Sequence, residues 1–233
     1  MAERPVFIPK ASGPVLVKTV TVSFQWFPGM ALTQKQKSIA SLHEEAVRSG
    51  QCAHPLEVSS KSTITTGVAL SAFNLGTLTQ KSLRSFTVET AFQSSKVFEN
   101  GGPFRDLLHA TSIEAKTDAR LRESGRLIRF DFFGESWPLE PKTAFYDWLY
   151  INTLVKNDEL ANDIVGFDAF TDIEFNPLRS INCQAYSLAL YKALSLRNLL
   201  GEALRSRSSF LKLVMSGAIS NAHESTDVQP RLV

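Results

Sequence analysis

Residues 88–96 read VETAFQSSK, and their spacing predicts how this part of the chain folds. In a helix each residue turns by about 100°, so residues three, four and seven positions apart share one side. The side chains on that side are those of Glu89, Phe92, Gln93 and Lys96. A solvent-facing stripe would not need the phenylalanine, and a core-facing stripe would not carry the three polar residues. The stretch therefore predicts a helix with Thr87 as its N-cap. The mixed face of this helix carries either a pair of surface charges or a functional site.

The bulk properties describe a chain that can bury a substantial core. It has 233 residues, of which 43% are hydrophobic and 21% are charged, as in a globular protein of one large domain or two small ones. The net charge of +2 gives no general attraction to nucleic acid, so such binding would need a local basic patch. No apolar run reaches the roughly 18 residues of a membrane-spanning helix, and we expect no membrane partner.

Cysteine usage and the N-terminal residues indicate a cytoplasmic protein. Cys52 and Cys183 are too few for a disulfide framework in a chain of this size, so we expect reduced thiols. Charges and prolines interrupt the N-terminal stretch MAERPVFIPKASG, which is unlike a secretory signal.

Alternating and helical patterns divide the chain into elements. Residues 15–27 alternate as a half-buried strand, and residues 33–50 follow as a helix. Residues 55–78 favour short strands and turns rather than helix, because they are rich in β-branched and hydroxyl residues. Three polar clusters lie inside that region: Ser59-Ser60-Lys61, Ser71 and Asn74.

The second half of the chain is expected to be mostly helical. Helices are predicted over residues 112–124 and 181–206, with a strand-like insert at 125–134 between the helical segments. The predicted fold is α+β, predominantly helical, with one domain over residues 1–215. Residues 216–233 are polar and are expected to fray.

The pair Glu89 and Lys96 has two interpretations. As exposed charges seven residues apart, they are too distant for i,i+4 pairing and would stabilise the helix little. In a desolvated site, the lysine would lose its proton more readily and attack carbonyl-like carbons to form a Schiff base, while the carboxylate transfers protons. Periodicity alone favours the exposed pair.

Other reactive residues fit simpler roles. Cys183 has no histidine near it in the sequence, so a buried structural thiol is its expected role. The histidines show no metal-ligand spacing, and we expect neither a metal nor a cofactor. Lys116 and Arg120 are four apart in a basic segment. They belong either to a solvated helix or to one face that contacts phosphate.

Several stretches resemble motifs of a known family. In order, GVALSAFNL (67–75), FTVETAFQSSKVF (86–98) and SIEAKTDARL (112–121) resemble the motifs of the NADAR superfamily, the YbiA-like N-glycosidases. FIPK (7–10), FYDWLYINTL (145–154) and FTDIEFNPLRSINCQA (170–185) are similar to the NADAR branch that serves as antitoxins to DarT-type DNA ADP-ribosyltransferases. The chain departs from the superfamily motif at Thr90, where a histidine is usual. Residues 170–185 replace a Trp-Gly-x-Gly-like stretch.

The resemblance implies a single NADAR-like domain that removes ADP-ribose from guanine bases of DNA by cleaving the N-glycosidic bond. Lys96 would be the Schiff-base nucleophile and Glu89 its proton-transfer partner. The resemblance implies that Ser71, Phe73 and Asn74 shape the ADP-ribose pocket. Our further candidates for substrate binding are Gln93, Lys116, Arg120, Asp172 and Asn182, with Glu174, Asn176 and Gln184 as additional polar residues. For Asp172 and Asn176, a role in a helix cap or turn is an equally good interpretation.

The implied partners are ADP-ribosylated guanine in DNA, preferably single-stranded, together with ADP-ribose and a DarT-type toxin. Two alternatives stay open at this point. One is an antitoxin without catalytic activity that binds ADP-ribose or sequesters its toxin, and the other is an N-glycosidase that acts on a small metabolite.

Overall fold

The computed structural model describes residues 1–78, 85–178 and 180–218 and has a mixed α and β architecture. A four-stranded sheet has the strand order β2-β1-β9-β3. Its strands are β1 (Ala2–Pro9), β2 (Val17–Phe24), β3 (Pro55–Glu57) and β9 (Ala169–Thr171). β1 and β2 form an antiparallel hairpin, whereas β3 and β9 pair in parallel. The sheet therefore joins the start of the chain to a segment far along it.

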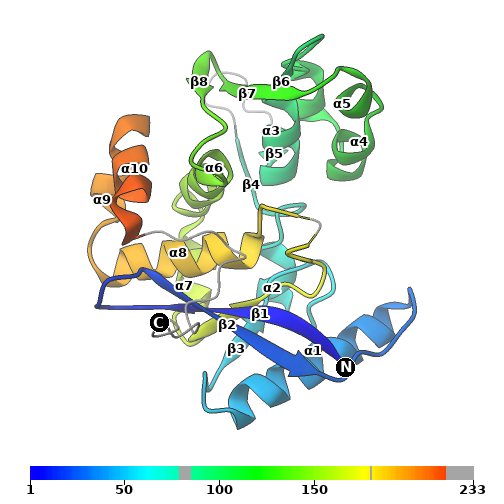
Figure 1. The fold of residues 1–233 in the computed structure, drawn as a ribbon, viewed down its shortest axis with the longest axis vertical. Coiled ribbons are helices and arrows are strands. Elements are labelled where there is room, and N and C mark those ends of the chain that lie inside the picture. Colours follow the sequence, from blue (N-terminus) through cyan, green and yellow to red (C-terminus); the bar gives the residue numbers. More distant parts are fainter. Residues whose placement is uncertain (79–84, 179, 219–233) are drawn as a thin grey trace, which may run out of the picture.

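Two helices cover this sheet, with α1 (Leu32–Arg48) below the hairpin and α8 (Gln184–Leu196) above it in Figure 1. Alternate residues of β2 on the α1 side, Val20, Val22 and Phe24, are buried with Leu42. On the other side, the Tyr186 ring packs edge-on to Phe7 with centroids 5.5 Å apart. Each such fully buried side chain stabilises the fold by roughly 1.5–3 kcal/mol. The predicted strand and helix at 15–27 and 33–50 are confirmed.

Further helices extend from α8. α6 (Ala144–Leu154) packs against it, and the buried Ser187 hydroxyl donates to Asp147 Oδ1 at 2.6 Å. The other helices of this half are α7 (Asp158–Asp163), α9 (Leu200–Ala203), α10 (Arg207–Leu213) and the π-helical turn η2 (Val214–Ala218).

The upper part of the molecule in Figure 1 is built around α3 (Val88–Ser94). α3 packs against α6, the 3₁₀ helix η1 (Arg105–His109) and α4 (Ser112–Thr117). The antiparallel sheet β6 (Lys96–Phe98), β7 (Leu127–Phe132) and β8 (Glu135–Trp137) lies above it. The remaining elements are α2 (Thr65–Ala69), α5 (Arg120–Glu123) and the strand pair β4 (Gly76–Leu78) and β5 (Ser85–Thr87).

Several predicted boundaries are wrong. Helix α3 begins after Thr87 as predicted, but it ends at Ser94, and Lys96 pairs with Phe130 as the first residue of β6. The predicted helix over 112–124 is broken at Asp118, and the one over 181–206 is broken near Asn198, which has a φ of +57°. Residues 65–69, predicted as part of strands and turns, form α2.

The expectation of a predominantly helical fold holds only loosely. β1 was not predicted, because its prolines and charges obscure the alternation, and it nevertheless forms a full hairpin with β2. The predicted frayed tail falls largely on residues 219–233, which lie outside the described residues, while Val214–Ala218 are in η2. None of the described helices is long and apolar enough to span a membrane.

Candidate active site

A cavity of about 430 Å³ lies beside the mixed face of α3. Its walls come from the turn after β3, the turn after α2, α3 with Lys96, α4, α6, and the segment from β9 to the start of α8. It brings together eight residues predicted from the sequence: Ser71, Phe73, Glu89, Gln93, Lys96, Lys116, Asp172 and Asn182. These positions are distant in sequence, so the fold collects them into one site.

The cap of α3 fixes the position of its catalytic candidates. The Thr90 N–H donates to Thr87 Oγ1 at 3.2 Å, and the Thr87 N–H donates to Thr90 Oγ1 at 3.0 Å, which forms a reciprocal capping box. The Glu89 N–H donates to the Ala72 carbonyl at 2.9 Å. This bond ties the start of the helix to the turn that carries Ser71, so Glu89 and that turn line the same wall.

Lys96 is half-buried at the end of this wall, immediately after α3. Burial lowers the pKa of its amine; the charge of Glu89 opposes this shift, and that of Lys116 adds to it. Its Nζ lies 4.8 Å from the centroid of the Phe92 ring. A lowered pKa increases the fraction of neutral, nucleophilic amine at a given pH. The exposed charge pair expected from periodicity is therefore wrong for these two residues, since Glu89 is buried.

Two polar atoms of the cavity wall have no hydrogen-bond partner within the described part of the chain: Ser71 Oγ and Gln93 Oε1. The other end of the Gln93 amide donates to Glu89 Oε1 at 2.8 Å, so its carbonyl oxygen is left as an acceptor. A buried polar atom without a partner destabilises a protein by about 1–3 kcal/mol. A polar ligand that reached these two atoms from the cavity would supply the missing hydrogen bonds.

Asp172, which lines the cavity, lies near a second carboxyl group, that of Glu57, which is buried behind the wall and does not line the cavity. Glu57, fully buried, accepts hydrogen bonds from Ser59 Oγ at 2.6 Å, Thr171 Oγ1 at 2.7 Å and the Ile173 N–H at 2.8 Å. Burial raises the pKa of Asp172 to about 8, and the charge of Glu57 adds to the shift. Asp172 therefore keeps its proton to a higher pH than an ordinary aspartate does, and in the protonated form it can donate a hydrogen bond to a ligand.

Two predicted pocket residues lie elsewhere. The Asn74 side chain donates to the Val68 carbonyl at 2.9 Å and does not line the cavity. Arg120 bonds to Asp106 and Asp118 instead. The prediction that Lys116 and Arg120 share one helical face is wrong, because α4 ends at Thr117 and Arg120 starts a separate helix.

The structure adds wall residues that sequence reasoning missed or left as weak candidates. Tyr146 of α6 lines the cavity, although nothing in the sequence singled this residue out. Ser59, from a polar cluster seen in the sequence, lines it too, as do Glu174 and Gln184. The third further candidate, Asn176, is absent from the wall; its Oδ1 accepts from the Leu178 N–H at 3.0 Å.

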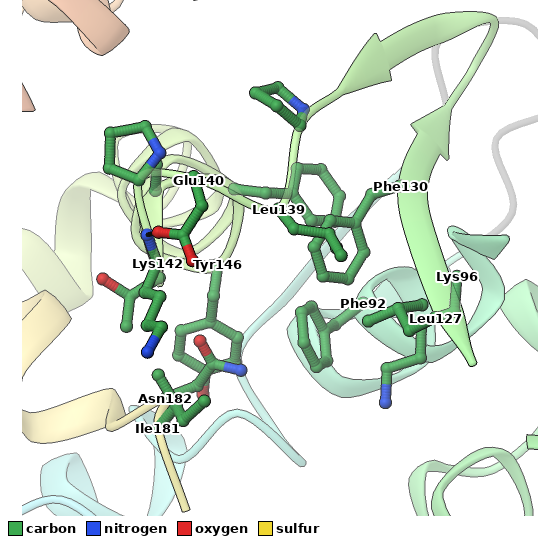
Figure 2. A pocket seen from close by; sticks show the side chains of 15 residues that line it. Phe92, Lys96, Leu127, Phe130, Leu139, Glu140, Lys142, Tyr146, Ile181 and Asn182 are labelled. Atoms are coloured by element: carbon green, nitrogen blue, oxygen red, sulfur yellow. Dashed lines mark hydrogen bonds between the residues drawn. The ribbon is translucent and has the colours of Figure 1, made fainter. Parts of the chain in front are cut away.

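A second cavity of about 310 Å³ opens beside the first (Figure 2). Phe92, Lys96, Tyr146 and Asn182 belong to the walls of both. The rest of the second wall is mainly apolar. Among the described residues, no group of three or more histidine, cysteine or acidic side chains could hold a metal ion.

A family model described as the DarT1-associated NADAR antitoxin matches residues 2–224. The chain belongs to this NADAR antitoxin family. No curated protein matches the chain significantly. The match confirms the resemblance seen in the sequence and supports an antitoxin role associated with DarT1. In this NADAR antitoxin, Thr90 stands where the superfamily motif usually has histidine, and its hydroxyl is used in the cap of α3.

Proposed function

We propose that this NADAR antitoxin is an ADP-ribosyl hydrolase that removes ADP-ribose from guanine bases of DNA and so reverses the action of a DarT-type toxin. The observation that carries the proposal is the environment of Lys96. Its amine has a lowered pKa and lines a polar cavity together with Glu89 and the unpartnered Ser71 and Gln93. This combination fits covalent catalysis by an amine on a sugar-sized polar substrate.

The proposed reaction begins with proton transfer to the ring oxygen of the ribose bonded to guanine. The ring opens, and the anomeric carbon becomes an iminium carbon that is still bonded to the guanine nitrogen. The neutral Lys96 amine adds to this carbon. The bond to the guanine nitrogen then breaks, the nitrogen takes a proton and the base leaves, while the lysine holds the sugar as a Schiff base. Glu89 is the proposed proton carrier for these steps.

Water completes the proposed cycle. It adds to the Schiff-base carbon, and the bond from that carbon to Lys96 breaks as the lysine nitrogen takes a proton. The aldehyde form of ADP-ribose is released and closes to its ring. One water is consumed for each base restored, and the lysine returns to its starting state.

Other wall residues have proposed binding roles. Lys116, whose Nζ lies 4.9 Å from the centroid of the Phe73 ring, provides a cation for the pyrophosphate. Protonated Asp172 is a donor for a sugar or phosphate oxygen. Ser71 Oγ and Gln93 Oε1 would pair with ribose hydroxyls, which both donate and accept.

The test is release of ADP-ribose from a single-stranded oligonucleotide that carries one ADP-ribosylated guanine, since a duplex would hide the base. The wild-type protein is expected to restore the guanine, and Lys96→Ala is expected to lose about a thousandfold or more of the rate. Lys156→Ala, a lysine of α6's C-terminal turn outside the cavity, is the matched control.

Borohydride reduction during turnover should join the sugar covalently to Lys96 in the wild type, because it converts the Schiff base to a stable amine. Mass spectrometry of the peptide that contains Lys96 measures the adduct. An intact substrate with folded wild-type protein would refute the hydrolase proposal. If Lys96→Ala protected cells from the toxin as well as the wild type does, binding rather than catalysis would explain protection.

A further inference from the structure

The second cavity has a wall of different character from the first. Its apolar lining residues are Leu127, Phe130, Leu139, Phe145 and Ile181, together with prolines 138 and 141. The polar wall of the first cavity, by contrast, carries serines, lysines and carboxyl groups. A flat, apolar ligand group fits the second cavity, and a hydroxyl-rich, charged group fits the first.

Lys96 lies where the two cavities meet. It shares this boundary with Phe92, Tyr146 and Asn182, which line both cavities. Figure 2 shows Phe92 and Lys96 on one side of the second cavity and Tyr146 and Asn182 on the other. A bond attacked by the Lys96 amine would therefore have one partner in each cavity.

An N-glycosidic bond joins groups of these two kinds. On one side of the anomeric carbon is a sugar with hydroxyls and a pyrophosphate, and on the other is a planar aromatic base. We propose that the apolar cavity is the binding site for the departing guanine, while the polar cavity holds the ADP-ribose. This inference rests on the proposed function and adds the place where the base is bound.

The geometry favours the guanine over the adenine of ADP-ribose as the occupant. The adenine is separated from the reacting carbon by two phosphates and a ribose, whereas the apolar cavity begins at Lys96 itself. Adenine in this cavity would draw the reacting carbon away from the amine. Guanine, which is bonded directly to the reacting carbon, is the group that would lie in the apolar cavity.

The outer rim of the cavity suits a base that remains attached to a DNA strand. Glu140 and Lys142 are exposed and lie across the cavity from Lys96 in Figure 2. A carboxylate and an ammonium there can accept from and donate to the polar edge of guanine, which carries donors and acceptors. The open rim leaves a route for the strand to reach solvent, as required for a base extruded into a pocket.

The test fills the apolar cavity and measures binding separately from catalysis. Leu139→Trp places an indole inside it, and Ile128→Trp adds the same group at an exposed position of β7 outside it. Each is combined with Lys96→Ala to prevent turnover. Calorimetry then measures affinity for free ADP-ribose and for a single-stranded oligonucleotide with one ADP-ribosylated guanine.

The expected result for Leu139→Trp is unchanged affinity for ADP-ribose and about tenfold weaker binding of the oligonucleotide, as for the loss of one stacked base. Ile128→Trp should change neither. If Leu139→Trp does not fold, Ile181→Trp narrows the same cavity from a half-exposed position.

Three outcomes separate this inference from the proposed function. Equal binding of the oligonucleotide by Leu139→Trp and its parent would overturn the inference, even if the wild type is an active hydrolase. Equal loss of affinity for both ligands would assign the cavity to adenine and also overturn it. Selective loss of oligonucleotide binding, with a wild type that releases no ADP-ribose, would support the base site and refute the hydrolase.

Discussion

Replacing Asp172 by asparagine tests whether this carboxyl group is neutral in the folded protein. Asp172 is only 7% exposed, and its Oδ1 accepts a hydrogen bond from the Glu174 N–H at 3.0 Å. Burial raises the pKa of Asp172 to about 8, with the charge of Glu57 adding to the shift. Asparagine keeps the shape and a neutral donor but cannot titrate, so the two proteins should differ in the pH dependence of their stability.

The size of the difference follows from proton linkage. The pKa of an unfolded aspartate is about 3.9, so between about pH 5 and pH 7 the folded protein holds roughly one more proton at this site. The raised pKa of Asp172 stabilises the folded protein most at pH values below the pKa of the unfolded aspartate. This stabilisation is lost as the pH rises towards the pKa of about 8 that Asp172 has in the folded protein. From pH 5 to pH 7 the loss is therefore roughly 3 kcal/mol.

Urea unfolding at about pH 5, 6 and 7 measures this loss, with fluorescence of the core residue Trp137 and of Trp148, which packs against the core, as the signal. The unfolding free energy of Asp172→Asn minus that of the wild type should grow by roughly 3 kcal/mol over this range. In a parallel Glu57→Gln protein, the pKa of Asp172 should fall because one cause of its shift is removed. A stability difference that is the same at all three pH values would refute the reasoning.

Three further predictions address packing and binding. Gly67→Ala should lower the unfolding free energy by about 1–3 kcal/mol in urea, because its Cβ would lie 2.1 Å from a backbone oxygen of β3; Gly166→Ala, with nothing within 4 Å, is the control. Arg120→Ala should leave ADP-ribose affinity unchanged in calorimetry, since the Arg120 guanidinium already binds two carboxylates. A large loss of ADP-ribose affinity would mean that Arg120 contacts the ligand after all. Ser71→Ala should raise the unfolding free energy by about 1 kcal/mol yet weaken ADP-ribose binding; losses in both would contradict its role as an unpartnered donor.

Local signals in the sequence predicted the start of α3 but not its end. The cap depends on Thr87 and residues within one turn of it, so the pattern was sufficient. The end depends on the pairing of Lys96 with Phe130, a strand contact between segments separated in sequence. Contacts of this kind leave no periodicity in either segment, and for this reason the helical spacing alone predicts Lys96 on α3.

The surroundings of Asp172 were harder to predict for a similar reason. Asp172 was a candidate, but Glu57 was not, because a single glutamate in a short strand carries no local signal. The parallel pairing of β3 with β9 brings Glu57 beside Thr171. For Arg120, a local signal was present but misleading. Its spacing from Lys116 predicts that both residues share one helical face, whereas the helix is broken at Asp118.

The strand order β2-β1-β9-β3 also has a consequence for biosynthesis. β1 pairs on one edge with β2 and on the other with β9, and β3 completes the sheet through β9. The N-terminal strands therefore cannot complete their sheet until residue 171 has left the ribosome. At about 5–20 residues per second, translation of this much chain takes roughly 10–35 s. A nascent antitoxin would be inactive for that interval, so prompt protection would depend on copies made before the toxin acts.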